Sequence, residues 1–265
     1  MEKNTKIIIS GAYGKMGQSL IKELKNFPKI TCTYALIKNK ISKKFKNHKN
    51  FNFPFLNLNQ LNQKKTVDFD VLIDFSNPKS SLQNLEFCIK KKKNIVIGTT
   101  GFTNLQMKYI KESSKKISIL YSPNFSCGIN LMCILLEKIS NVIGENSDIA
   151  ILESHHKNKK DQPSGTALYL KSIITNTMKW KFQNKNISEY FYLNKKKNKK
   201  KIICSSLRLG NIIGKHTVIF ENSQEILKIT HKAVTRDIFS QGALKSAYWL
   251  KNKKNGFFTM RDVLI

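Results

Sequence analysis

The chain begins with a β-branched run, Lys6–Ser10, that stops directly at a glycine-rich segment, Gly11–Gly17. A short run of this kind, without alternating polar residues, is typical of a parallel strand that is covered on both faces. Apolar residues then recur every three or four positions over Met16–Phe27, and Pro28 ends this predicted helix. A second apolar run at Ile30–Ile37 completes a strand–helix–strand unit. This unit constrains the beginning of the chain to the α/β class.

The alternation of strand and helix continues to about residue 126. Strands that alternate with helices favour a parallel, doubly wound sheet with helices on both of its faces. Further strands are expected at Asp70–Phe75, Asn94–Ile97 and Ile117–Tyr121, and further helices at Pro78–Lys93 and Thr103–Lys116.

The pattern changes after Gly128. Helices are expected at Ile129–Ile143 and Thr166–Lys179, and strands at Asp148–Glu153, Ile202–Leu209, His216–Phe220 and Glu225–Thr230. Several strands with only two helices favour a mixed or antiparallel sheet, and therefore a second domain of the α+β class. A lysine-rich stretch within it, Lys195–Lys201, is expected to be a solvated loop, and a last helix is expected over Arg236–Lys251.

Length and composition limit the class of protein. The 265 residues suffice for one large or two modest domains. The five cysteines are an odd number without a Cys-x-x-Cys pair, which argues against a disulfide framework and against a cysteine-only zinc site. No apolar run approaches about 18 residues, so no membrane-spanning helix is expected. The first strand begins so early that no signal peptide is expected, and the chain is predicted to be a soluble cytoplasmic protein.

The net charge of +30 raises the question of nucleic-acid binding. Nearly all of the basic residues are lysines. Recognition of bases and phosphates relies on arginine, which occurs only at Arg208, Arg236 and Arg261. The lysines are spread over the whole chain, and Lys195–Lys201 contains no aromatic residue on which a base would stack. The charge is therefore interpreted as a compositional bias that attracts anionic ligands in general, and neither nucleic acid nor a membrane is expected as a partner.

The segment Gly11–Gly17 lies where a dinucleotide-binding turn would lie, between the first strand and the first helix. Glycines there allow the backbone to approach a pyrophosphate, and the helix N-terminus offers unpaired N–H groups. The spacing is Gly-x-x-Gly-x-x-Gly, and an ordinary β–α turn remains the alternative. The second strand ends without the carboxylate that binds an unphosphorylated ribose, and Lys38 favours a 2′-phosphate unless it is one more solvated lysine.

Two further segments, Gly98–Gly101 and Ser122–Phe125, follow predicted parallel strands. Ligands bind at the carboxyl ends of such strands, so both segments are expected to line one cleft together with Gly11–Gly17. Each segment alone would be interpreted as a turn.

The segment Glu153–Thr166 combines two adjacent histidines with several lysines and a Pro-Ser-Gly-Thr helix start. Adjacent histidines do not have the spacing of a helical zinc pair, and no cysteine lies nearby, so no metal site is expected. The hydroxyl and N–H groups of Ser164, Gly165 and Thr166, together with the histidine and lysine charges, suit a small carboxylate. A surface loop before a capped helix is the alternative.

These motifs together resemble a known family. In order they are Gly11–Gly17, Gly98-Thr-Thr-Gly-Phe102, Asn124-Phe-Ser126, Glu153-Ser-His-His156, Lys159-x-Asp-x-Pro-Ser-Gly-Thr166, Gly214-Lys-His-Thr217 and His231-Lys-Ala233. The chain resembles the 4-hydroxy-tetrahydrodipicolinate reductase (dihydrodipicolinate reductase) family from Lys6 to Leu264, which is nearly its whole length. Two positions depart from the family pattern: Tyr13 stands where a small residue is common, and Ile37–Lys38 lacks the usual acid.

The resemblance implies a Rossmann-like parallel-sheet domain over residues 1–126 and 236–265, and a mixed-sheet α+β domain over 127–235 for substrate and assembly. It also implies a homotetramer and NADPH or NADH as cofactor. The implied reaction reduces a cyclic imine dicarboxylate to tetrahydrodipicolinate, in lysine and diaminopimelate biosynthesis.

The resemblance further assigns roles to residues. His155 and Lys159 are expected to be catalytic, and His156, Gly165 and Thr166 to bind substrate. The expected cofactor contacts are Gly11, Ala12, Tyr13, Gly14, Lys15, Met16, Lys38, Gly98, Thr99, Thr100, Ser122, Pro123, Asn124 and Phe125. Arg208, Lys215 and His216 are left without a role. The alternatives are another Rossmann-type oxidoreductase of a small carboxylate, such as a semialdehyde dehydrogenase with Cys127 as nucleophile, and a basic nucleic-acid-binding protein.

Overall fold

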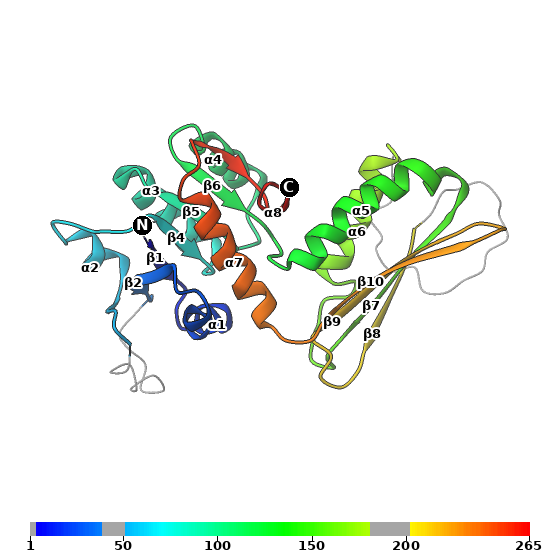
Figure 1. Ribbon diagram of the computed structural model, residues 1–265, viewed down its shortest axis with the longest axis horizontal. Helices are drawn as coiled ribbons and strands as arrows, with labels where there is room; N and C mark the ends of the chain where they lie inside the picture. The colour runs from blue at the N-terminus through cyan, green and yellow to red at the C-terminus, as the bar shows by residue number, and fades with distance from the viewer. Residues whose placement is uncertain (1–3, 39–50, 181–201) are drawn as a thin grey trace. The chain divides into compact units, whose positions relative to one another are not determined.

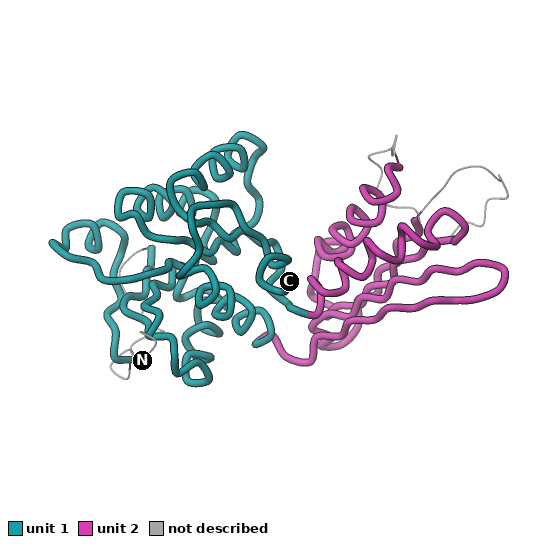
Figure 2. Tube along the Cα trace, turned by 45° about the horizontal axis from the view of Figure 1, so that its top comes forward, with its two compact units in different colours: residues 1–127, 237–265 teal, residues 128–236 magenta. Residues whose placement is uncertain are grey.

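The computed structural model describes residues 4–38, 51–180 and 202–265. The chain divides into two compact units, shown in different colours in Figure 2. Unit 1 comprises Met1–Cys127 and Asp237–Ile265, and unit 2 comprises Gly128–Arg236. The loop expected at Lys195–Lys201 lies outside the described residues.

Unit 1 is built on a seven-stranded sheet in the order β11-β6-β5-β4-β1-β2-β3 (Figure 1). Every neighbouring pair in this sheet is parallel, which confirms the expected doubly wound architecture. The strands are β1 (Thr5–Ser10), β2 (Ile30–Leu36), β3 (Phe55–Leu56), β4 (Val71–Asp74), β5 (Asn94–Ile97), β6 (Ser118–Tyr121) and β11 (Gly256–Phe258).

Two apolar cores cover the two faces of this sheet, and adjacent residues of β1 alternate between them. Ile7 and Ile9 pack in one core with residues of α1 and α7, whereas Ile8 packs in the other with residues of α3 and α4. A strand buried on both faces gains by being apolar at every position, which explains the unbroken run in the sequence. The helices of unit 1 are α1 (Lys15–Glu23), η1 (Leu24–Asn26), α2 (Leu58–Asn62), α3 (Pro78–Lys91), α4 (Asn104–Ser113), α7 (Asp237–Leu250) and α8 (Met260–Leu264).

Helix α7 returns to unit 1 from the end of unit 2 and packs beside α1. Ser19 of α1 contacts Ser240 of α7 at 2.8 Å between their hydroxyl oxygens, and it donates to Asp237 at 3.1 Å. Gly242 lies where α7 meets the carbonyl of Phe125, because a Cβ at Gly242 would be 1.8 Å from that oxygen. The last helix is therefore an integral part of unit 1.

Unit 2 has a mixed four-stranded sheet in the order β10-β9-β7-β8, with β7 and β8 parallel and the other pairs antiparallel. This confirms the expected α+β sheet. Strand β7 continues two residues beyond the predicted end at Glu153 and includes His155, which pairs with Arg208. The elements are α5 (Cys127–Ile143), η3 (Gly144–Asn146), β7 (Asp148–His155), α6 (Gly165–Thr177), β8 (Ile202–Arg208), β9 (Gly214–Glu221) and β10 (Ile226–Ala233).

Helices α5 and α6 pack on one face of this sheet around Leu136, Leu170 and Phe220. By length and composition alone, Cys127–Asn146 is long and apolar enough to cross a membrane, with a mean hydropathy of 1.4. One side of α5, however, is buried in the core of unit 2, including Ile129 and Leu136. We therefore describe α5 as a core helix.

Candidate active site

The carboxyl edge of β1 turns at Gly11, which has a φ of +79°. A Cβ at this position would lie 2.2 Å from the carbonyl oxygen of Phe75, so the position requires glycine for both its conformation and its space. A Cβ at Gly17 would lie 2.3 Å from the carbonyl oxygen of Gly11. These two glycines let α1 begin close against the end of β1.

Gly14 differs from these two glycines because its nearest backbone neighbour, the carbonyl oxygen of Gly11, would be 3.1 Å from an added Cβ. It is the N-cap of α1, provides no side-chain cap, and is followed by no acidic residue in the first helical turn. The first N–H groups of such a helix have no intrahelical acceptor. The turn therefore fits a pyrophosphate at the start of α1.

Phe75, at the end of β4, connects the segments that were expected to line one cleft. Its carbonyl oxygen lies against Gly11, where an added Cβ would be 2.2 Å away. Its ring lies against Gly98, where an added Cβ would be 2.1 Å from the nearest ring carbon. Its ring centroid is 5.4 Å from that of Phe125. The structure thus brings the segments after β1, β5 and β6 to the same edge of the sheet. Sequence reasoning did not assign Phe75, since nothing local distinguishes it from a core aromatic residue.

A buried carboxylate, Asp74, fixes the loops at this edge. It accepts hydrogen bonds from Ser76 Oγ at 2.6 Å, Asn84 Nδ2 at 2.9 Å and Thr99 Oγ1 at 2.7 Å. The Thr99 hydroxyl also accepts from the Ser76 amide at 3.0 Å. The Thr99 side chain is thus engaged within the protein, whereas Thr100 is exposed.

The remaining cofactor candidates lie around the same edge. Ser122 donates to the carbonyl of Asn124 at 2.7 Å and shapes the turn through Pro123. Tyr13 stacks on Phe55 with ring centroids 5.8 Å apart. Lys38 is exposed two residues after the end of β2. Ala12 is buried, and Lys15 and Met16 open helix α1.

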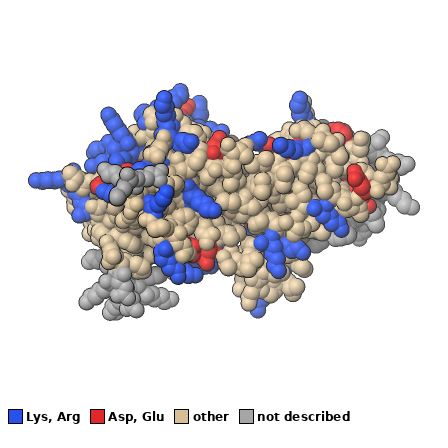
Figure 3. All heavy atoms as spheres, in the orientation of Figure 1, with Lys and Arg blue, Asp and Glu red and all other residues tan. Residues whose placement is uncertain are grey.

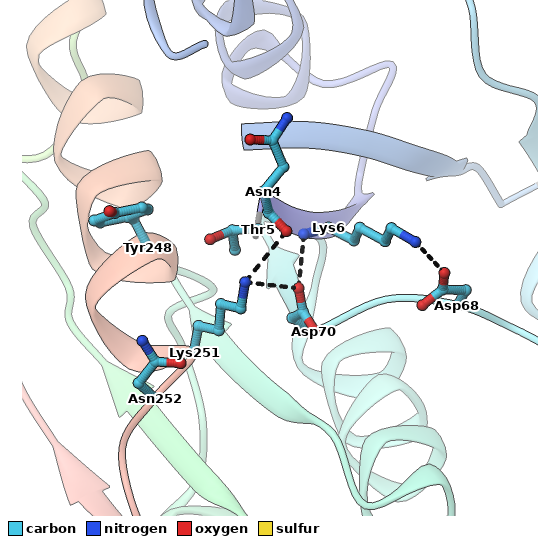
Figure 4. A pocket seen from close by; sticks show the side chains of 8 residues that line it. All are labelled: Asn4, Thr5, Lys6, Asp68, Asp70, Tyr248, Lys251 and Asn252. Atoms are coloured by element: carbon cyan, nitrogen blue, oxygen red, sulfur yellow. Dashed lines mark hydrogen bonds and ion pairs between the residues drawn. The ribbon is translucent and has the colours of Figure 1, made fainter. Parts of the chain in front are cut away.

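The opposite, amino-terminal edge of the sheet has a cavity of about 270 Å³ (Figure 4). Its charges are paired with one another: Lys6 with Asp68, and Lys251 with Asp70 at 3.6 Å. Lys251 also donates to the carbonyl of Asn4 at 3.2 Å. Lys251 thus connects the end of α7 with Asn4, which precedes β1, and with Asp70, which precedes β4. The cavity contains none of the predicted site residues; it is lined by Asn4, Thr5, Lys6, Asp68, Asp70, Tyr248, Lys251 and Asn252.

In unit 2, a cluster of buried polar side chains surrounds Glu153. Its carboxylate contacts His155 Nδ1 through Oε2, and through Oε1 it accepts from Arg208 Nη2 at 2.6 Å and from the Ser164 amide at 3.2 Å. Burial raises the pKa of Glu153, but the hydrogen bonds from His155 and Arg208 outweigh it and lower that pKa to about 2. Glu153 is therefore an ionised carboxylate at neutral pH.

His216 lies against His155, with their ring centroids 5.1 Å apart and edge to face. Its Nε2 is 3.3 Å from the Ser164 hydroxyl. Burial, followed by the positive charge of His155, lowers the pKa of His216 to about 4, although Glu153 acts in the opposite direction. His216 is thus neutral at pH 7, and the charge in the cluster belongs to the other members.

The loop that carries Lys159 is held by Arg208. The guanidinium donates through Nε to the carbonyl of Lys159 at 3.2 Å and through Nη2 to the carbonyl of Asp161 at 2.6 Å. The Lys159 ammonium is 2.8 Å from the Asp161 carboxylate, and its side chain remains partly exposed. Arg208 therefore connects this loop to Glu153, although sequence reasoning left Arg208 and His216 without a role.

The expected carboxylate receptor lies at the start of α6. Ser164 is its N-cap and accepts from the Ala167 amide at 3.2 Å. Gly165 is exposed, and a Cβ there would have no neighbour within 4 Å, so the space beside its Cα is open. Its backbone N–H donates to the Asp161 carboxylate. Thr166 and His156 are half-buried. The structure thus brings His155, Lys159 and the start of α6 together around Glu153 and Arg208.

Within the described residues, Glu153, His155 and His216 also form a group whose donor atoms lie within 4.8 Å of one another, as in a metal site. Sequence reasoning considered only adjacent histidines and cysteines, and it did not anticipate this group. Both carboxylate oxygens of Glu153 already accept hydrogen bonds from the protein.

A Rossmann-like unit with a glycine turn, combined with a separate unit that carries a histidine–carboxylate cluster, defines a two-part oxidoreductase of the dehydrogenase class. The chain belongs to the dihydrodipicolinate reductase family. Family models described as "Dihydrodipicolinate reductase, N-terminus" and "Dihydrodipicolinate reductase, C-terminus" match residues 5–125 and 128–264. The resemblance inferred from the motifs is thereby confirmed.

Curated relatives match over nearly their whole length. The chain is 51% identical over 271 residues to the 4-hydroxy-tetrahydrodipicolinate reductase of Buchnera aphidicola subsp. Cinara cedri, covering 100% of this chain and 98% of that protein. It is 46% identical over 265 residues to the protein of that name from Wigglesworthia glossinidia brevipalpis, covering 98% and 92%. Family membership and the Rossmann-like unit imply a nicotinamide cofactor.

Among solved structures, the dipicolinate-bound dihydrodipicolinate reductase from Paenisporosarcina sp. TG-14 is similar with a TM-score of 0.80, at 24% identity and 97% coverage of both chains. A myo-inositol dehydrogenase from Corynebacterium glutamicum is similar with a TM-score of 0.60, at 10% identity, covering 96% of this chain and 90% of that one. At these identities the likeness establishes the fold.

Proposed function

We propose that this protein reduces 4-hydroxy-tetrahydrodipicolinate to tetrahydrodipicolinate with NADPH or NADH, in lysine and diaminopimelate biosynthesis. The observation that carries the proposal is the cluster in unit 2: a histidine held by a buried carboxylate, beside a lysine and the N-terminus of α6. This arrangement suits a dianionic substrate that must also receive a proton.

The cofactor would be held at the carboxyl edge of the sheet in unit 1. The backbone of Gly11–Met16 would bind the pyrophosphate at the start of α1, where no side chain blocks the approach to Gly14. The segments Gly98–Thr100 and Ser122–Phe125 would bind further along the same edge. When bound, the nicotinamide supplies the hydride, and the protein's residues supply position, charge and a proton.

The substrate would be held in unit 2 by positive charge and by hydrogen-bond donors. Gly165 and Thr166 offer N–H groups and a hydroxyl to one carboxylate, and His156 contacts the ring substituents. His155 and Lys159 supply the proton that must accompany the hydride. The balance is one hydride and one proton added and one water lost, the oxygen of that water being the 4-hydroxyl of the substrate.

Lys38 supports a preference for NADPH. It is exposed just after β2, where an acidic residue would bind an unphosphorylated ribose, and its ammonium can pair with a 2′-phosphate. This position is the basis for distinguishing NADPH from NADH.

The outer face of the mixed sheet supports assembly into a homotetramer. Among the side chains that alternate away from α5 and α6, four apolar ones are exposed, Leu152 at 41%, Ile203 at 54%, Leu207 at 51% and Ile226 at 55%. Exposed apolar side chains gathered on one sheet face, among polar ones, are typical of a surface that another subunit covers. Light scattering should give four chains, and Leu207→Asp should lower that number.

A cytoplasmic location and the absence of a nucleic-acid partner also belong to this proposal. All five cysteines are free, as expected in a reducing compartment. On the face shown in Figure 3, lysine and arginine side chains occur over both units and are not gathered in one patch. Such a distribution favours general attraction of anions.

The experiment that tests the proposal follows oxidation of NADPH and of NADH by nicotinamide absorbance. The substrate, 4-hydroxy-tetrahydrodipicolinate, is generated in the cuvette by its synthase. We expect oxidation that depends on both the synthase and this protein. No oxidation of either nucleotide, by protein whose fold is verified by circular dichroism, would exclude this function.

A further inference from the structure

Glu153 is a buried carboxylate that contacts His155 but has no chemical step of its own in the proposed function. Its side chain is 1% exposed, and burying a charge is costly unless it is paired and hydrogen-bonded. Both of its carboxylate oxygens are engaged by the protein, Oε2 by His155 and Oε1 by Arg208 and the Ser164 amide. A group of this kind acts through its neighbours.

The strand register explains how Glu153 and His155 meet. The two residues are two apart on β7, so both side chains point to the same face of the sheet. Across the sheet, Glu153 is opposite His216 on β9, and His155 is opposite Arg208 on β8. The sheet therefore places one negative charge among three basic side chains.

The ring of His155 has two distinct ends. Nδ1 contacts Glu153, whereas Nε2 faces Gly214, where an added Cβ would be only 3.1 Å away. A glycine at that position keeps the space beside Nε2 free of a side chain. One nitrogen thus contacts the carboxylate, and the other lies beside a residue that has no side chain.

We propose that Glu153 is a positioning residue for His155: it accepts the Nδ1 proton and fixes the ring, so that Nε2 is the nitrogen that delivers a proton to the substrate. This inference rests on the proposed function, in which His155 is a proton donor. A carboxylate beside a histidine stabilises its charged form and selects one tautomer of the neutral form.

Arg208 completes the arrangement by fixing the carboxylate. It binds Glu153 Oε1, which leaves Oε2 directed at His155, and the same guanidinium holds the loop of Lys159. The charged or titratable groups that face His155 are therefore Glu153, Arg208, His216 and Lys159, with His231 farther away beyond His216. His216 is neutral at pH 7. The carboxylate in direct contact with His155 is that of Glu153, whereas Asp161 pairs with Lys159.

The test compares Glu153→Gln, which removes the charge and keeps the shape, with Glu153→Asp, which keeps the charge at a shorter reach. Asp148→Asn, an exposed carboxylate on the same strand, is the matched control. For Glu153→Gln we expect kcat to fall about 10- to 100-fold, less than for loss of the acid itself, with KM nearly unchanged. We expect the pH profile of kcat to differ from that of the wild type, because the negative charge beside the proton donor is lost. Glu153→Asp should recover part of both effects, and Asp148→Asn should match the wild type.

A second readout does not depend on activity. Nitrogen-15 NMR of the wild-type protein should show His155 protonated at Nδ1 in its neutral form, with a downfield-shifted proton that disappears in Glu153→Gln. A neutral His155 protonated only at Nε2 in the wild type would overturn the proposal, even if Glu153→Gln does not fold. Wild-type kcat and an unmoved pH profile in folded Glu153→Gln would overturn it as well.

These outcomes separate the inference from the function on which it rests. If the wild-type protein fails to oxidise either nucleotide with the stated substrate, the proposed function fails, while the NMR measurement still decides whether Glu153 holds the Nδ1 proton. If the wild type is active and Glu153→Gln is unaffected, the function stands and the positioning role is excluded.

Discussion

The two candidate binding regions are built by opposite means. At the carboxyl edge of the parallel sheet in unit 1, glycines remove side chains so that backbone segments approach one another, as Gly11 and Gly17 do at the start of α1. At the end of β7 in unit 2, polar side chains occupy the space, and the carboxylate of Glu153 accepts hydrogen bonds from Arg208 and His155.

The difference predicts how each region fails. At the carboxyl edge of the sheet in unit 1, which we call the glycine edge, an added side chain should disrupt cofactor binding, because the added atoms collide with closely packed backbone. The cluster should fail when a side chain is removed, because buried partners then lose their hydrogen bonds and their compensating charge.

Removal of a proton donor from the cluster should have the largest effect. His155→Ala or Lys159→Ala should lower kcat by about 10² to 10⁴-fold, the usual contribution of a positioned acid. The neighbouring variant His156→Ala is the control and should mainly raise the substrate KM. Steady-state kinetics at saturating NADPH measure both constants. An unchanged kcat in both His155→Ala and Lys159→Ala would refute their assignment as proton donors.

The cluster should also make stability depend on pH through His216. Its pKa is lowered from 6.5 to about 4 in the folded protein, so between these values the unfolded chain binds the extra proton. Stability therefore rises with pH across this window and is lost as pH falls from 6.5 to 4, by on the order of 2–3 kcal/mol for this group. Urea unfolding at several pH values should show a flatter dependence for His216→Gln. An equally steep dependence in that variant would assign the effect to another group.

The contrast between the regions also separates what the sequence predicts from what it does not. The glycine turn, the strand ends and the segment Glu153–Thr166 are local patterns, and the structure places them on the elements expected. Arg208 is 55 positions from Glu153 and meets it only because β8 pairs with β7 in one register. Local spacing contains no information about such a pairing, so the partners of Glu153 could not be predicted.

Short elements were missed for a different reason. Strand β3 has two residues, β11 has three, and helices α2 and α8 have five each. A period of two or of 3.6 residues cannot be recognised over so few positions. The first helix was predicted to reach Phe27, but α1 ends at Glu23 and continues as a single 3₁₀ turn, Leu24–Asn26.

Addition of a side chain at the glycine edge should abolish cofactor binding without unfolding the protein. In Gly14→Val the new Cβ would have one close neighbour, the Gly11 carbonyl oxygen at 3.1 Å, so we expect the fold to persist, whereas the side chain would block the approach to the helix N-terminus. We expect the cofactor Kd to rise more than tenfold. This exceeds the effect of losing one hydrogen bond, which contributes about 1 kcal/mol. Fluorescence titration with NADPH measures it.

Gly11→Ala provides the contrast to Gly14→Val. Its Cβ would collide with the Phe75 carbonyl at 2.2 Å and its φ is +79°, so this variant should lose stability as well as binding. Cofactor binding that survives Gly14→Val would show that the segment is only a turn.

Choice of cofactor should depend on a single exposed side chain. Lys38→Ala should raise the KM for NADPH about 3- to 10-fold and leave that for NADH nearly unchanged, because an exposed ion pair contributes on the order of 1 kcal/mol. Lys90→Ala, an exposed lysine on α3, is the control for the general effect of charge. The difference should shrink at high salt, as expected for screened charges. Equal KM changes for both nucleotides would exclude contact with a 2′-phosphate.

The smallest effect is expected at the start of α6, where the cluster binds through backbone N–H groups, as the glycine edge of unit 1 does. Thr166 lies in the first turn of α6, and the N–H groups of that turn remain when its hydroxyl is removed. Thr166→Val keeps the shape of the side chain, so it should raise the substrate KM a few-fold, about the value of one hydrogen bond, and leave kcat nearly unchanged. Steady-state kinetics at saturating NADPH, with cofactor Kd measured separately, test this. A large fall in kcat would show that this hydroxyl acts in the chemical step, and that the start of α6 is organised by side chains like the rest of the cluster.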